Sequence, residues 1–310
     1  YPMKKFARIL TALALAVTLS ILIPLIRLLC RRGTLALLVR RLVGAAILVG
    51  LLINLFYATW GLNYFRVPLK ERMSLEVTER PLDELESLTR ELVRRINAIR
   101  PGLPEDEEGT AALEEGYRAV FDALPEAFES LGLRQPALSG KVTRAKSVLW
   151  SEGLSWCGIT GVYVGITAEP NVNVDAPAFL LPHTAAHEMA HQLGVASEDE
   201  AEFAGFLACL CSEDPSVVYA GLASMLIYCG NAIYDRDQKL YWEIYESYCD
   251  GLRRDLRHHR AYWDAFEGRA EEAATQINDN YLKHNGQESG VDSYGEVVDM
   301  LLAYCALTDF

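Results

Sequence analysis

Two uncharged apolar stretches near the N-terminus constrain this chain more than any other feature. One comprises 18 residues, Ile9 to Ile26, and the other comprises 24 residues, Leu42 to Phe65. A helix of about 20 apolar residues crosses the roughly 30 Å of bilayer hydrocarbon. The sequence therefore predicts a membrane region over residues 1–65, with transmembrane helices at about 9–26 and 42–65. A signal peptide followed by a buried core helix is the alternative.

The balance of charge changes sign after these stretches. Residues 1–72 contain eleven Lys and Arg and one acidic residue, whereas residues 73–310 contain 18 Lys and Arg and 41 Asp and Glu. Five Arg residues lie between the apolar stretches and three cations precede the first, so the positive-inside rule predicts a cytoplasmic connection. We expect a multi-pass protein of the cell membrane with residues 66–310 as an extracytoplasmic domain. The net charge of −13 argues against nucleic-acid binding.

The body of the chain is predicted to be mainly α with a small β-sheet, an α+β fold. Apolar residues recur at helical spacing from Leu85 to Ile96, and a second helix is predicted from about Thr110 to Leu131. Residues 148–174 are rich in β-branched and aromatic residues with glycine, which predicts two or three short strands. Helices are expected from Pro182 almost to the end, with turns near Gly194, Asp214-Pro215, Gly230 and Gly268.

The chain has seven cysteines and no CxxC pair, so it carries no zinc-ribbon or thioredoxin signal. We expect buried free thiols, and disulfide pairing in an oxidising compartment remains the alternative.

The segment that carries chemistry is an HExxH motif formed by His187, Glu188 and His191. Residues four apart share one face of a helix, so the two imidazoles can bind one metal ion. Zn²⁺ accepts imidazole nitrogen and keeps a position open for water in catalytic sites. Glu188 follows the first ligand directly, where it can act as general base toward the zinc-activated water.

An ordinary amphipathic helix with solvated His and Glu would also contain this pattern. Three features favour a metal site instead. Ala185, Ala186 and Ala190 are small enough for close helix packing, a strand-rich segment precedes the motif, and acidic residues follow it.

A third ligand is expected on the next helix. In one class of zincins, a Gly three residues after the second His turns the chain, and a third His ligand follows three residues later. Gly194 matches the turn, but position 197 is Ser, so this third His is absent. Glu198 and Glu202 are four residues apart and share a face, which predicts Glu198 as the metal ligand and Glu202 as the partner of a ligand histidine. Glu200, which would complete a capping box with Ser197, is the rival ligand. A capped and solvated acidic first turn remains the alternative.

Four blocks resemble the DUF3810 family, uncharacterised bacterial membrane proteins with a zincin-type HExxH. They are FYATWGLNYFRVPL at 56–69, GITGVY at 158–163, HTAAHEMAHQLGVASEDEAEF at 183–203 and NDNYLKHNGQESGVDSYGEVVDMLLAY at 278–304. The resemblance implies an N-terminal membrane region, a helical zincin-like domain and an earlier transmembrane helix that this sequence lacks. It also implies Asn at position 202, where this chain has Glu.

The polar block near the C-terminus offers candidate donors to the oxyanion of a transition state. Tyr281, His284 and Tyr294 are the candidates, and a polar turn between two helices is the alternative. His258 and His259 lie among three Arg residues, which is typical of a solvated helix face.

These features together predict a membrane-anchored zinc metallopeptidase that cleaves a peptide or protein substrate. The segment from Val162 to Val164 is expected to pair with an extended peptide. The alternative is a zincin-like membrane protein that binds a metal or a partner without catalysis. An intramembrane protease is disfavoured, because no uncharged span of 18 residues surrounds His187.

Overall fold

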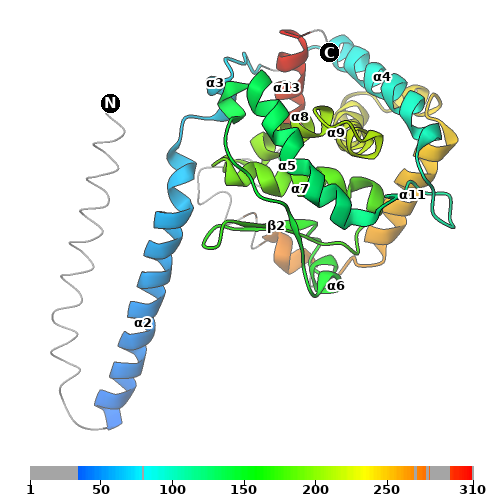
Figure 1. Ribbon diagram of the computed structural model, residues 1–310. Helices are drawn as coiled ribbons and strands as arrows, with labels where there is room; N and C mark the ends of the chain where they lie inside the picture. The colour runs from blue at the N-terminus through cyan, green and yellow to red at the C-terminus, as the bar shows by residue number, and fades with distance from the viewer. Residues whose placement is uncertain (1–33, 79, 269–270, 277–278, 280–293, 309–310) are drawn as a thin grey trace. The chain divides into compact units, whose positions relative to one another are not determined.

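The computed structural model describes residues 34–308 except 79, 269–270, 277–278 and 280–293 (Figure 1). The predicted transmembrane helix at 9–26 lies outside these residues. The chain divides into two compact units, residues 1–62 and 63–310.

The described part of the first unit is one long apolar helix. Helix α2 runs from Thr34 to Thr59, and its segment Ala36–Thr59 has a mean hydropathy of 2.2 with only 6% of its most apolar window buried. The predicted bounds 42–65 are wrong at both ends. Arg40 and Arg41 lie within the helix, because a charged side chain does not interrupt backbone hydrogen bonding. The 3₁₀ helix η1 (Gly61–Phe65) then follows.

The second unit is mainly helical, as predicted, and helix α9 (Pro215–Arg236) forms its centre (Figure 1). Four helices pack against α9: α4 (Leu82–Ile99), α8 (Glu198–Leu210), α10 (Gln238–Tyr245) and α13 (Tyr294–Cys305). Like α2, α9 is long and apolar enough to cross a membrane, but 67% of its most apolar window is buried in the fold. The remaining helices with printed bounds are α3 (Leu69–Arg72), α5 (Gly116–Arg134), α6 (Ser151–Ser155), α7 (Leu181–Gln192) and α11 (Asp250–Asp264), with short 3₁₀ turns η2 (Arg100–Gly102), η3 (Pro136–Leu138) and η4 (Ala178–Leu180).

Two strands lie within the predicted residues 148–174, and a third lies just before them; the three form one small sheet. Strands β1 (Lys146–Ser147), β3 (Glu169–Val172) and β2 (Gly161–Val164) lie in the order β1-β3-β2. Strand β1 is parallel to β3, and β2 is antiparallel to it with Val162 opposite Asn171. Among the described strands, β2 therefore forms an edge. Both β2 and β3 pack on α7.

Two predicted boundaries differ from the structure. Helix α5 begins at Gly116 rather than near Thr110, because Glu105 and Ala111 form an antiparallel bridge and Asp106 accepts hydrogen bonds from the backbone of Glu108 and Thr110. Gly230 lies inside α9 and marks no turn.

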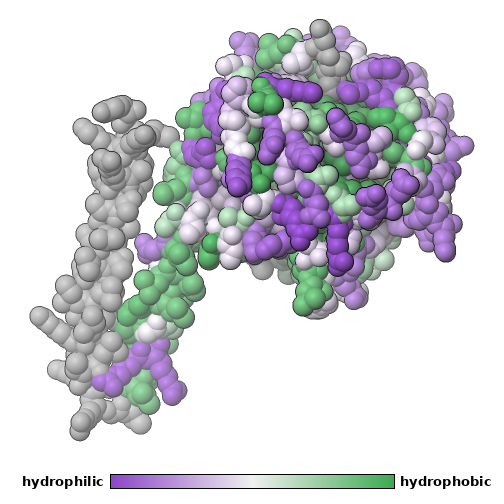
Figure 2. Space-filling model, viewed as in Figure 1, coloured by the Kyte–Doolittle hydropathy of each residue, from purple (hydrophilic) through white to green (hydrophobic). Residues whose placement is uncertain are grey.

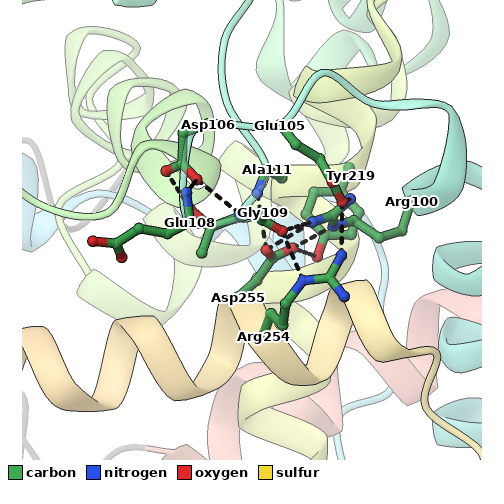
Figure 3. A network of polar contacts seen from close by, with 10 residues as sticks. Arg100, Glu105, Asp106, Glu108, Gly109, Ala111, Tyr219, Arg254 and Asp255 are labelled. Atoms are coloured by element: carbon green, nitrogen blue, oxygen red, sulfur yellow. Dashed lines mark hydrogen bonds and ion pairs between the residues drawn. The ribbon is translucent and has the colours of Figure 1, made fainter.

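A buried polar network joins the segment before α5 to α9 and α11 (Figure 3). The side chain of Arg100 is 2% exposed, and its Nε donates to Asp255 Oδ2 at 2.6 Å. Asp255, which is fully buried, also accepts from the Tyr219 hydroxyl and from the backbone of Ala111. Arg254 reinforces the network by donating to Gly109 and Glu105. Except for Tyr219–Asp255, these bonds join segments about 150 residues apart in sequence.

The six cysteines of the described residues are all free thiols. Cys209 and Cys229 are buried. For this part of the chain the prediction of free thiols is confirmed.

Candidate metal centre

Helix α7 places the HExxH motif in the interior of the second unit. Pro182 lies in its first turn, where the missing N–H costs no hydrogen bond. His187, Glu188 and His191 are at most 7% exposed. Ala185, Ala186 and Ala190 are fully buried, as their small size had indicated. This burial contradicts the alternative of an ordinary amphipathic helix with solvated His and Glu.

Helix α8 approaches the backbone of α7 closely at Gly205. A Cβ atom built on Gly205 would lie 2.9 Å from the backbone nitrogen of His187, which only glycine avoids. Gly194 makes the predicted turn between the helices with φ +76°, a left-handed conformation that favours glycine. This turn and the close approach bring the acidic residues of α8 to the histidines of α7.

Glu198 and Glu200, the two candidates for the third ligand, have different partners in the structure. Ser197 is the N-cap residue of α8, as predicted, but its side chain makes no capping hydrogen bond in the described structure. The predicted capping box is wrong, because the carboxylate of Glu200 accepts from the backbone of Lys70 at 3.1 Å. Glu200 thus binds the start of α3 and lies outside the cluster of potential ligands.

His187, His191 and Glu198 bring their potential ligand atoms within 4.8 Å of one another. Glu198 Oε2 lies 3.1 Å from His187 Nε2 and 3.8 Å from His191 Nε2. The Glu198 side chain is 38% exposed, so the cluster is accessible from one side.

These donors fit a tetrahedral zinc ion. Zinc with ligands at about 2.0–2.1 Å holds its ligand atoms about 3.3 Å apart, close to the separations between Glu198 and the two imidazoles. Two nitrogens and one carboxylate are also a ligand set typical of catalytic zinc.

The Nδ1 atom of each HExxH histidine, which faces away from Glu198, lies close to an oxygen atom. His191 Nδ1 donates to the backbone oxygen of Val195 at 2.7 Å, which leaves the lone pair of this imidazole on Nε2. His187 Nδ1 lies 3.2 Å from Glu202 Oε1. His183 Nδ1 in turn lies 3.5 Å from the other oxygen of Glu202. The structure therefore brings Glu202 to the position expected for the partner of a ligand histidine.

The carboxylates dominate the electrostatics of His187. Burial alone would lower its pKa, but Glu202 and Glu198 more than offset burial, so the pKa lies well above its ordinary value. Burial would raise the pKa of Glu202, yet His187 and His183 lower it to about 2. The two carboxylates thus favour positive charge on the His187 imidazole.

Glu188 is 5% exposed, and burial raises its pKa to about 8. Its carboxylate lies against the first residue of β2, since a Cβ atom on Gly161 would come 2.5 Å from Glu188 Oε1. Any larger residue at Gly161 would have to displace Glu188.

The sequence did not predict the contacts of Gly161 and Tyr163 with the HExxH helix. Alternate residues of this strand face α7, so that Gly161 contacts Glu188 and the ring of Tyr163 lies 5.6 Å from the ring of His191. Gly161 and Tyr163 are two residues apart on the strand, and they contact Glu188 and His191, which are three residues apart on the helix. The alternation of Gly161-Val162-Tyr163-Val164 indicates which residues share a face of the strand. It does not indicate which residues of α7 they contact.

Of the predicted transition-state donors, Tyr281 and His284 lie outside the described residues. Tyr294 is the first residue of α13, and its side chain is not described. The prediction of a solvated face at His258 and His259 is wrong for His259, whose ring lies 6.2 Å from that of Phe179 and which accepts a hydrogen bond from Trp263.

Replacing Glu202 with Gln is expected to weaken zinc binding by about 10–100-fold, because His187 loses its charged partner. Competition with a chromogenic chelator on the purified full chain measures this. The matched control is Glu200→Gln on the same helix, for which the affinity should stay unchanged. Equal affinities of the two variants would show that Glu202 does not support the ligand.

A family model described as a protein of unknown function, DUF3810, matches residues 5–302. No curated protein and no solved structure matches the chain. The matched residues include helix α2 and the three potential ligands His187, His191 and Glu198.

Proposed function

This chain belongs to the DUF3810 family, whose function is unknown, and we propose that it is a membrane-anchored zinc metallopeptidase with a zincin-like domain. One observation carries the proposal. His187, His191 and Glu198 bring potential ligand atoms within 4.8 Å of one another, and Glu188 lies next to His187 on helix α7.

His187, His191 and Glu198 would hold the metal. When bound, zinc supplies a Lewis acid that polarises the scissile carbonyl and lowers the pKa of water. Glu188 accepts the proton of the attacking water on its carboxylate and passes it to the leaving amine. Burial raises the pKa of Glu188 above that of a solvated carboxyl group, which suits a group that both takes and returns a proton.

Strand β2 is the proposed docking edge for the substrate. It is an edge among the described strands, and it runs along α7 beside Glu188 and His191. Its backbone can add an extended peptide as a further strand. The exposed side chains of Val162 and Val164 lie on the face turned away from α7 and would flank such a peptide.

The membrane anchor rests on α2, whose apolar side chains are exposed along its length. Together with the stretch at 9–26 it would make two spans, joined by an Arg-rich cytoplasmic connection. The metallopeptidase domain would then lie outside the cytoplasm.

Elemental analysis of the purified full chain is expected to find one zinc per chain. His187→Ala and Glu198→Ala should each lose it, because two of the three donors cannot hold the ion tightly. Circular dichroism of each variant shows whether it remains folded.

Glu200→Gln is the matched control, since Glu200 lies two residues from Glu198 but binds α3. It should retain the metal. A folded wild-type chain that takes up no zinc would reject the proposed function. Zinc without cleavage of any member of a peptide library would indicate a metal-binding protein without catalysis.

A further inference from the structure

An apolar corner projects from the second unit beside α6. Leu149 is fully exposed and Trp150 is 71% exposed, although both are large apolar side chains. The indole of Trp150 lies over Gly153, where an added Cβ would come 2.6 Å from the ring. Figure 2 shows a hydrophobic protrusion at the lower edge of the second unit, where Figure 1 labels α6. Water is a poor solvent for such a surface, so it points to a binding partner.

The chain just before this corner is basic. Residues 130–151 contain Arg134, Lys141, Arg144 and Lys146 and no acidic residue, within a body that holds 41 acids and 18 cations. Lys141, Arg144 and Lys146 are exposed. This local excess of positive charge fits an anionic partner.

A cavity of about 470 Å³ lies beside the same segment. It is lined by the cations Arg118, Arg144 and Lys146 and by the aromatic residues Tyr117 and Phe121, together with Ala145 and Ser147. Arg144 pairs with Asp122 and Lys146 with Glu169, but all four side chains are 39–57% exposed. Exposed ion pairs contribute little, so these cations can exchange their partners for a phosphate. Leu149 follows Ser147 by two residues, about 7 Å of extended chain.

We propose that this corner, residues 141–150 with Arg118, binds the surface of an anionic phospholipid bilayer. Arg118, Arg144 and Lys146 would hold a headgroup phosphate, while Leu149 and Trp150 enter the interface between headgroups. Trp is enriched at this depth of membranes, and nearby Lys and Arg add attraction to anionic lipids. The apolar tip favours a bilayer over free phosphate, which would leave Leu149 and Trp150 in water. The proposal is independent of the metal centre.

The test uses the full chain reconstituted in bilayers containing phospholipids brominated on their acyl chains, which quench nearby tryptophans. The chain has five tryptophans, so the emission of Trp150 is obtained as the difference between wild type and Trp150→Phe. We expect strong quenching of this difference in bilayers with phosphatidylglycerol and weaker quenching in pure phosphatidylcholine. The matched control is Trp242→Phe, because Trp242 is 54% exposed but lies among acidic residues. Its difference emission should not be quenched.

The triple variant Arg118→Gln, Arg144→Gln, Lys146→Gln isolates the charge contribution. It should retain its fold, because these side chains are at the surface, and lose the dependence on phosphatidylglycerol. Quenching of Trp150 equal to that of Trp242 in every bilayer would overturn the proposal. So would loss of the quenching on addition of millimolar inorganic phosphate, which would identify a site for free phosphate instead.

Discussion

The variant Glu188→Gln is expected to bind one zinc per chain and to hydrolyse peptides with a kcat/KM about 10²–10⁴-fold below wild type. Gln has the size of Glu, so the contact with Gly161 is preserved, but an amide cannot accept the proton of the attacking water. The measurement is cleavage of a proteome-derived peptide library, followed by mass spectrometry, with zinc content determined on the same samples.

Two comparisons make this result specific. Glu200→Gln carries the same chemical change, and it should cleave like wild type because Glu200 binds the backbone of Lys70. Wild-type rates for Glu188→Gln would reject Glu188 as the general base while leaving the metal site intact. Loss of zinc in this variant would instead assign Glu188 to metal binding.

The second large effect concerns stability. Replacing Asp255 with Ala is expected to lower the free energy of unfolding by about 3–5 kcal/mol, because it leaves the guanidinium of Arg100 buried without its carboxylate. The Tyr219 hydroxyl and the backbone N–H of Ala111 lose their acceptor as well. Urea unfolding of the full chain, followed by circular dichroism, measures the change.

Asp264→Ala is the matched control on the same helix. Asp264 pairs with Arg260 at the surface, with exposures of 56% and 85%, so its loss should cost less than about 1 kcal/mol. Adding Arg100→Met to Asp255→Ala should cost less than the sum of the single changes, because the two side chains interact directly. Equal stability of Asp255→Ala and Asp264→Ala would show that the network does not hold the fold together.

The sequence predicted best those features that depend on neighbours along the chain. Leu85, Leu88, Leu92 and Ile96 all became buried on one face of α4. The convergence of His187, His191 and Glu198 also follows from local spacing, since a turn of few residues at Gly194 joins their helices.

The features that sequence reasoning missed depend on contacts between distant segments. Glu200 has the spacing of a capping residue, yet the N-terminus of α3, 130 residues earlier, offers its carboxylate a backbone donor. Likewise, Arg100 and Asp255 are 155 residues apart. The hydrophobic periodicity of a sequence does not indicate such pairs. They form only when helices that are distant in sequence pack against one another.

The free cysteines of the second unit have a consequence for its redox chemistry. Burial raises the pKa of Cys229 to about 12 and that of Cys305 to about 12, and it raises the pKa of Cys209 further. At neutral pH only about one in 10⁵ such thiols is a thiolate, the form that attacks disulfides and oxidants. A low thiolate content slows the reaction of these three thiols with disulfides and oxidants.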